Sequence, residues 1–516
     1  MKFLTFCMLM ATGVLGAADH QGGAMPEKII GMYVHQHWAY KHPYAARTWT
    51  LDDWRGYCDG LHRLGYNTVM IWPVLEIAPN PLTESDKENI EKIAQVINIL
   101  HQEYGMKALL TIAPNVAAKN EAAAKYAFQE RPFFYCDYRV NPGDPAAMAE
   151  MIAWREKLLR PLANMDGLVI IDSDPGGYPG STNEEFVDLL MAHRNILDRL
   201  RPGIELVYWM HAGWEAYCRY YATAEFAMGP DEETVETVRL LEKQNPEPWG
   251  LTGGRFSAME AMGHGARMFP FPYGAIEGEP SFPMTNFGGE GAYATGKSSG
   301  PRGIMGNAQT HCIQLPNTFA FARGAQGLSC AESDYVHFAN DLIPGQGEGI
   351  VAAWKALAGT DAAQMAGAEP KLKMLADQSI TPGPLKGLLL GDPKRFINDL
   401  VMQLRLRASL EEFHQAVFTR PMDKAEVAAS FAAFIAAAET WQKQHNYKNN
   451  WSWPRMEEAL LKLDNESLNS AMKAHSYIGE GQTPFEKVQN GFLTVETYTP
   501  RLIEAMKKAL EEIRTL

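Results

Sequence analysis

The fold prediction rests on the stretch Gly167-Leu168-Val169-Ile170-Ile171, which runs directly into Asp172-Ser173-Asp174-Pro175-Gly176-Gly177. A short apolar run without polar alternation is typical of a strand that is buried on both faces of a parallel sheet. Two carboxylates and a Pro-Gly-Gly turn follow it at once. Because parallel α/β folds collect their functional groups at the carboxyl ends of the strands, this junction indicates a functional site.

Comparable apolar runs alternate with amphipathic helical stretches on both sides of this junction. Strands are expected at 30–34, 67–72, 107–112, 167–172, 205–211, 249–252, 266–271 and 303–307. Helices are expected between them, the first opened by Thr50 as its N-cap. Repeated β–α units predict a parallel sheet, and about eight of them favour a closed (β/α)8 TIM barrel over an open doubly wound sheet. No glycine-rich phosphate-binding motif follows the first strand.

The chain has 516 residues, more than a barrel of roughly 250 to 350 residues requires. From about residue 348 onward the sequence becomes rich in alanine and leucine at helical spacing. We therefore expect an α/β barrel followed by a mainly helical C-terminal region. The expected divisions are a signal peptide at 1–18, a catalytic barrel at 19–335 and the helical region at 336–516.

The first residues have the pattern of a secretory signal peptide. Lys2 precedes an apolar stretch at 3–14, and the small residues Gly16, Ala17 and Ala18 follow. A buried N-terminal strand is the alternative. No later stretch approaches the roughly 20 apolar residues of a membrane helix. The protein is therefore expected to be secreted or periplasmic, without an integral membrane segment.

The formal net charge is −14, and no basic run interrupts the acidic chain. This composition lacks the electrostatic footprint of a nucleic-acid-binding protein. The cysteines that follow the signal peptide are scattered and include no CxxC pair, so neither a zinc site nor a disulfide framework is expected, although one or two bridges remain possible. We expect no cofactor and a glycan or glycoconjugate as substrate, and the sequence allows a homo-oligomer.

Polar and aromatic side chains crowd the predicted strand ends. The candidate catalytic residues, which carry imidazole or carboxylate groups, are His35, Asp172, Asp174 and His211. The candidate substrate-binding residues, which are aromatic, amide-bearing or charged, are His37, Trp72, Glu76, Asn115, Trp209, Trp214, Glu215, Arg255, Arg267, Tyr273, Asn317 and Arg323. Aromatic rings stack on sugar faces, while carboxylates and imidazoles transfer protons, so the set is typical of a carbohydrate-active enzyme.

Asp172 and Asp174 give the sharpest signal. If the strand continues, residues at i and i+2 face the same way, and two neighbouring carboxylates tend to divide into one charged and one protonated group. Glycoside hydrolysis needs that combination. Two alternatives remain open: the aspartates could cap a helix or hold the loop, or they could join His35 and His37 in a metal site. Each single Trp or His also has a purely structural explanation.

These features together resemble a group of barrel exo-glycosidases. An Asp-rich end to the fourth strand and a fifth strand that ends in Trp209-Met210-His211 are similar to family 20 type β-N-acetylhexosaminidases, although the Asp-Glu pair of that family reads Asp172-Ser173-Asp174 here. The polar stretch 306–311, with 314–318 and Arg323, resembles the inverting (β/α)8 sialidases more closely. That resemblance implies His and Asp at the strand ends and Arg and Asn on the sugar acid.

The sequence therefore predicts a secreted exo-glycoside hydrolase, with an inverting exo-sialidase as the first choice. An exo-β-N-acetylhexosaminidase and a catalytically inactive carbohydrate-binding barrel are the alternatives. For a sialic acid substrate, Arg255, Arg267 or Arg323 is expected to hold the carboxylate, because the guanidinium group binds carboxylates through a planar fork.

Overall fold

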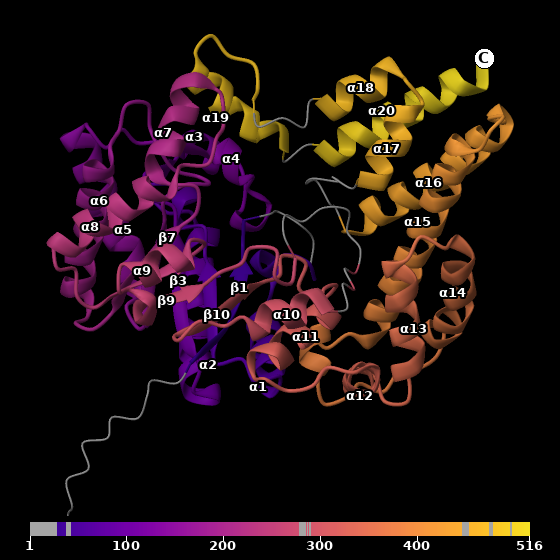
Figure 1. Ribbon diagram of the computed structural model, residues 1–516, viewed down its shortest axis with the longest axis horizontal. Coiled ribbons are helices and arrows are strands. Elements are labelled where there is room, and N and C mark those ends of the chain that lie inside the picture. Colours follow the sequence, from indigo (N-terminus) through magenta and orange to yellow (C-terminus); the bar gives the residue numbers. More distant parts are fainter. Residues whose placement is uncertain are drawn as a thin grey trace, which may run out of the picture.

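A parallel sheet of eight strands forms the N-terminal part of the molecule (Figure 1). The computed structural model describes residues 28–37, 43–277, 285, 287, 290–445, 454–473, 478–495 and 498–515, so the predicted signal peptide lies outside the described residues. The strands are β1 (Ile29–His35), β2 (Thr68–Trp72), β3 (Lys107–Ile112), β6 (Gly167–Ile171), β7 (Glu205–Met210), β8 (Trp249–Gly253), β9 (Met268–Pro270) and β10 (Gly303–Asn307).

The order of these strands is β10-β1-β2-β3-β6-β7-β8-β9, and β10 lies beside β9. The sheet is thus closed nearly into a barrel, and the predicted TIM-barrel class is confirmed. The predicted strands agree with the observed ones to within a residue or two. The main difference is at β6, which ends at Ile171, so that Asp172 is the first residue of the following loop.

Helices cover the outside of the barrel. They are α1 (Leu51–Arg63), α2 (Glu84–Tyr104), α5 (Pro145–Leu159), α6 (Asn183–Leu200), α8 (Asp231–Lys243), α9 (Phe256–Ala261), α10 (Glu290–Lys297) and α11 (Leu315–Ala325). Thr50 is the N-cap of α1, as predicted, and Asp53 completes a capping box with it. Such boxes satisfy the free backbone N–H groups of the first turn. Short 3-10 turns lie at Ala46–Thr48, Leu75–Ile77, Phe128–Glu130, Arg160–Leu162, Gly265–Arg267 and Lys386–Leu389.

Aromatic rings fill the barrel interior. Strand register places Tyr33, Trp209 and Phe271 near one another, with ring centroids 5.6 Å apart for Tyr33–Trp209 and 4.7 Å for Trp209–Phe271. At the amino end of the strands, Arg302 forms an ion pair with Glu205 at 2.6 Å. The interior is therefore a packed core, and in barrels of this type functional sites lie at the opposite end, where the strands terminate. We call that end the carboxyl face.

Three long excursions rise from the carboxyl face. The segment after β3 contains the hairpin of β4 (Val116–Ala118) and β5 (Asp137–Arg139) with α3 (Asn120–Ala123) and α4 (Phe133–Cys136). The segment after β7 contains α7 (Trp214–Thr223), and the third follows β9. Long loops of this kind usually carry function in a compact domain.

All described elements from Glu332 onward are helices, which confirms the mainly helical character expected of the C-terminal region. They are α12 (Glu332–Leu342), α13 (Gly347–Ala358), α14 (Ala362–Ala376), α15 (Pro393–Phe418), α16 (Lys424–His445), α17 (Pro454–Lys462), α18 (Glu466–Lys473), α19 (Pro484–Val495) and α20 (Tyr498–Thr515). Across the part of the chain that the structure describes, no helix combines the length and apolar character needed to cross a bilayer.

The helical region contacts the carboxyl face at several places, of which two lie beside the loops after β1 and β6. In the loop after β1, Tyr44 donates a hydrogen bond of 2.7 Å to Asp399 of α15. On the other side, α19 leaves the remaining C-terminal helices and lies against α4 and α7 (Figure 1). There Phe485 packs between Tyr178 and Tyr221, with ring centroids 5.4 and 5.3 Å away. The C-terminal region therefore borders the end of the barrel where a site is expected.

Candidate active site

Asp172 is fully buried and occupies a structural position behind the carboxyl face. Its carboxylate accepts hydrogen bonds from the Tyr208 hydroxyl at 3.0 Å and from the backbone N–H groups of His211 and Gly213 at 3.2 Å. Burial raises the pKa of Asp172, while its hydrogen bonds, first that from Ser173, and the nearby His211 act in the opposite direction. The prediction that Asp172 faces the carboxyl face is wrong, because residue alternation turns it away from the barrel interior.

Ser173 links Asp172 to His211. The Ser173 hydroxyl donates to Asp172 Oδ1 at 2.6 Å, accepts from the backbone N–H of Ala212 at 3.1 Å, and lies 3.0 Å from Nδ1 of His211. Since the single hydroxyl proton is directed to the carboxylate, Nδ1 of His211 acts as the donor to Ser173. We call this chain Asp172–Ser173–His211 the relay. It fixes the orientation of the imidazole and leaves Nε2 for a ligand or a proton.

Asp174 is partly exposed, unlike Asp172. Its backbone is left-handed, with φ of 58°, so the chain turns there and the two aspartates do not share a face. Gly177 completes the turn against α7, where a Cβ atom would lie 2.9 Å from Cβ of Tyr217. Burial raises the pKa of Tyr220 and, less strongly, the nearby Asp174 carboxylate does the same. Asp174 therefore presents a carboxylate beside the aromatic residues of α7.

His35 and His37 lie at the end of β1, and their rings are stacked with centroids 4.9 Å apart. The backbone N–H of His37 donates to Nδ1 of His35 at 3.0 Å, which places the proton of a neutral His35 ring on Nε2. Burial lowers the pKa of both rings well below the usual value, and Arg47 contributes to both shifts. These histidines are therefore neutral groups suited to hydrogen bonding.

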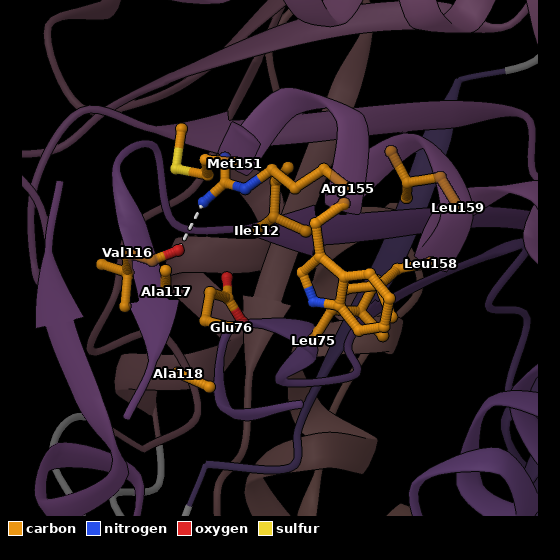
Figure 2. A pocket seen from close by; sticks show the side chains of 11 residues that line it. Leu75, Glu76, Ile112, Val116, Ala117, Ala118, Met151, Arg155, Leu158 and Leu159 are labelled. Atoms are coloured by element: carbon orange, nitrogen blue, oxygen red, sulfur yellow. Dashed lines mark hydrogen bonds between the residues drawn. The ribbon is translucent and has the colours of Figure 1, made fainter. Parts of the chain in front are cut away.

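Glu76 lies behind the wall of the barrel instead of at its open end. It accepts a hydrogen bond from Nε1 of Trp72 at 3.1 Å and another from the backbone N–H of Ala113. Glu76 and Arg155 both line a cavity of about 20 Å³ whose walls are mainly apolar. Figure 2 shows these lining side chains. That space is large enough for one water molecule and too small for a sugar. Glu76 thus supports Trp72, which contacts both His35 and His37.

Four other predicted binding residues have structural partners. Asn115 donates to the carbonyl groups of Val140 and Gly177 at 2.8 and 3.0 Å. Trp214 stacks on Phe186, and Glu215 accepts from the backbone of Asn183 at the start of α6. Asn317 donates to Ile276 O at 3.2 Å. These side chains hold the loops and helices around the carboxyl face together.

Trp209 and Tyr273 lie on the carboxyl side of the barrel. Trp209 packs in the interior beneath it, whereas Tyr273 is partly exposed and its hydroxyl accepts a hydrogen bond from Gln309. Asn307, which pairs in register with Tyr33, donates to the carbonyls of Tyr273 and Glu277. Its buried Oδ1 has no hydrogen-bond partner in the described part of the protein. Such an atom is a candidate partner for a polar ligand.

The three predicted carboxylate-binding arginines do not converge on the carboxyl face. Arg255, in the loop after β8, pairs with Asp231 at 2.6 Å and donates to Gly229 O. Arg267 precedes β9 at the amino end and pairs with Glu247 at 2.5 Å. Arg323 lies in the last part of α11 and pairs with Asp334 at 3.3 Å. All three guanidinium groups therefore have partners within the protein.

Three residues that the sequence reasoning missed are important here. Ser173 forms the relay, and strand alternation, which places it on the face of Val169 and Ile171, could have identified it. Glu277, after β9, accepts hydrogen bonds from the backbone N–H groups of Gln309 and Thr310 at 2.8 and 2.7 Å. Arg139 forms a buried ion pair with Asp137 at 3.2 Å and donates to the Tyr221 hydroxyl. No strand-end pattern points to Arg139.

The described residues contain no group of three His, Cys, Asp or Glu side chains placed to hold a metal ion. Cys58, Cys218 and Cys312 are buried free thiols, Cys330 is a partly exposed one, and Cys136 is buried. Among the described residues of the carboxyl face, His211 has an imidazole held by Ser173 and Asp174 has a partly exposed carboxylate.

Comparisons with known proteins find only distant structural similarity. No family model and no curated protein matches the chain. A variant of GH5_18 from Streptomyces cattleya, solved with Manβ1-4GlcNAc, is 17% identical at a TM-score of 0.24, and the match covers 35% of this chain and 44% of that one. This chain thus spans less than half of that protein.

Two further structures match over more of their length. GH5_18 from Streptomyces cattleya with GlcNAc is 14% identical at a TM-score of 0.33, covering 67% of this chain and 92% of that chain. The N-acetylneuraminate lyase of Aliivibrio salmonicida is 11% identical at 0.33, covering 74% and 97%. None of these structures is similar enough to indicate an activity for this chain.

Proposed function

We propose that the protein is an exported exo-acting glycoside hydrolase that works at the carboxyl face. The observation that carries this proposal is the relay. It orients His211 through Ser173, and the residue after Ser173 is Asp174, whose side chain is partly exposed. Hydrolysis of a glycosidic bond requires one group that donates a proton and one that accepts a proton; two carboxyl groups usually fill these roles, and here an imidazole would take the place of one of them.

In the proposed reaction, one of these two groups protonates the leaving oxygen while the bond between that oxygen and the anomeric carbon breaks. The other accepts a proton from the water molecule whose oxygen bonds to the anomeric carbon. The relay favours His211 as one member because Nδ1 is held by Ser173 and Nε2 can donate or accept. Neutral His35 and the buried Oδ1 of Asn307 supply hydrogen bonds for hydroxyl or acetamido groups.

The charges around the site favour a neutral or N-acetylated terminal sugar over sialic acid. A sialic acid carboxylate requires an available cation, and Arg255, Arg267 and Arg323 are all paired within the protein. An exo-β-N-acetylhexosaminidase therefore takes precedence, and sialidase activity becomes the second candidate. The resemblance of the loop at 306–311 to inverting sialidases keeps that second candidate in the test.

The test is a panel of 4-nitrophenyl or 4-methylumbelliferyl glycosides that carry GlcNAc, GalNAc, mannose, galactose, glucose and sialic acid. We expect one neutral or N-acetylated glycoside to be cleaved best. Preferred cleavage of the sialoside would restore the sialidase assignment. Binding of a glycan without cleavage of any glycoside would support the catalytically inactive barrel instead.

Proton NMR of the first-formed anomer tests the stereochemistry. We expect inversion, because Asp174 and His211 follow different strands, β6 and β7, and an inverting enzyme needs its acid and base far enough apart for a water molecule. A retained anomer would contradict the inverting mechanism but not the hydrolase proposal. The signal peptide predicted at 1–18 supports a secreted or periplasmic location, which N-terminal sequencing of the exported protein would check.

A further inference from the structure

A solvent-exposed apolar pair lies on the loop between α7 and α8, beside the two segments that carry Asp174 and His211. Phe226 is 50% exposed and Met228 is 57% exposed, although both are large apolar side chains. We propose that Phe226 and Met228 form a platform that binds the sugar ring next to the terminal one in an oligosaccharide substrate. This proposal rests on the glycosidase function and names a subsite for it.

The first support is the contact of Phe226 with the Asp174 side of the site. Its ring packs edge-on against Tyr217 and Tyr220 of α7, with centroids 5.7 and 5.6 Å away. Gly177, in the same loop as Asp174, packs directly on Tyr217. Burial raises the pKa of Tyr220, and the charge of Asp174 adds to this shift. The exposed phenyl ring is therefore continuous with the aromatic residues beside the candidate catalytic carboxylate.

The second support is the anchoring of the same loop to the His211 side. The backbone N–H of Gly229 donates to the carbonyl of Ala212, the residue after His211, at 2.9 Å. A Cβ atom on Gly229 would lie 3.0 Å from that carbonyl oxygen, so this close approach depends on glycine. Arg255 donates to Gly229 O at 2.7 Å and pairs with Asp231 at the start of α8.

These contacts hold the Phe226 ring and the backbone of the loop that carries Met228 in place before any ligand arrives. A preorganised surface loses little conformational entropy on binding, which makes an exposed aromatic ring an effective platform. The apolar face of a pyranose ring is the ligand that fits an aromatic ring next to hydrolytic groups, because its C–H bonds stack on the ring while its hydroxyl groups remain in water. Arg255 thus has a role here other than carboxylate binding: it fixes the platform loop.

The experiment compares Phe226→Ala, Met228→Ala and wild type on two kinds of substrate with the same terminal sugar: a trisaccharide and a methyl glycoside. We use triacetylchitotriose with methyl GlcNAc, and 3′-sialyllactose with methyl sialoside. We compare kcat/KM for the trisaccharide with kcat/KM for the methyl glycoside. Truncation of a platform side chain is expected to lower the ratio of the first to the second about tenfold. Phe418→Ala, at a 38% exposed ring at the end of α15, is the matched control.

Calorimetric binding of the same trisaccharides to Asp174→Asn separates this proposal from the glycosidase proposal. We expect Phe226→Ala in that background to weaken binding about tenfold, whether or not the wild-type protein cleaves the sugar. An unchanged ratio and unchanged binding in both platform variants would overturn the platform. If the wild-type protein cleaves none of these sugars but its binding of them still depends on the platform, the glycosidase proposal is contradicted and the platform proposal is not.

Discussion

Ser173 is the residue that positions His211 in the proposed site. Its hydroxyl is hydrogen-bonded to Asp172 and to His211, at 2.6 and 3.0 Å, and so it orients the imidazole without touching substrate. Ser173→Ala should lower kcat about tenfold to a hundredfold with little change in KM, because the imidazole loses its fixed orientation. Ser173→Thr keeps the hydroxyl and should restore most of kcat. Equal kcat values for wild type, Ser173→Ala and Ser173→Thr would show that the relay has no part in the mechanism.

Asp172 is a positioning residue in this account, and its replacement should have a different signature. Asp172→Asn keeps one acceptor oxygen but turns an amide group toward donors such as the N–H of Gly213 and the Tyr208 hydroxyl. The unfavourable contacts should cost about 1 to 3 kcal/mol of stability, in addition to a lower kcat. Chemical denaturation measures the first effect. A loss of kcat at unchanged stability would instead assign Asp172 a direct part in proton transfer.

Helix α19 is the element that ties the C-terminal region to the carboxyl face. Phe485 fills the space between Tyr178, which follows Asp174 in the same loop, and Tyr221 of α7. Phe485→Ala should speed amide hydrogen exchange in 484–495 and 174–180 and lower stability by about 1 to 2 kcal/mol, since the ring is only partly buried.

The control for this substitution is Leu461→Ala on α17, where the side chain is 56% exposed. It should leave exchange in both segments unchanged. If Phe485→Ala also leaves the loop at 174–180 protected as in the wild type, α19 does not hold that loop.

The strands could be predicted because each is a run of apolar residues between turn signals, and β3 and β10 were placed to the residue. Site residues were harder to place because side-chain direction depends on where a strand ends. β6 ends at Ile171, one residue before Asp172, and a left-handed residue at Asp174 breaks the alternation. Arg267 and Arg323 were also misplaced, because the sequence does not show which end of an element faces the site.

Buried neutral histidines shape the pH dependence of the whole molecule. Burial lowers the pKa of His311 and of His193 to about 3, and Arg155 adds to the shift of His193. The unfolded chain therefore binds more protons than the native one between pH 6.5 and 3, so the stability these groups contribute is lost as the pH falls through that window. Each such histidine should contribute a slope of up to about 1.4 kcal/mol per pH unit.

Denaturation of wild type and His311→Gln between pH 7.5 and 4 measures this slope. The destabilisation caused by the substitution should be largest near pH 7 and should shrink as the pH falls below 6.5. His337→Gln, at a side chain that is 83% exposed, is the control and should leave the slope unchanged. A destabilisation by His311→Gln that is the same at every pH would contradict a neutral buried His311.

The central claim is that the carboxyl face hydrolyses a glycosidic bond with Asp174 and His211. The most direct measurement is kcat on the best glycoside of the panel for Asp174→Asn, His211→Ala and the control Asp188→Asn, which changes an exposed carboxylate of α6. We predict a loss of about 10² to 10⁴ for the first two at unchanged melting temperature, and wild-type kcat for the control. A wild-type kcat in both Asp174→Asn and His211→Ala would contradict the claim, and so would the absence of cleavage of every glycoside by the wild-type protein.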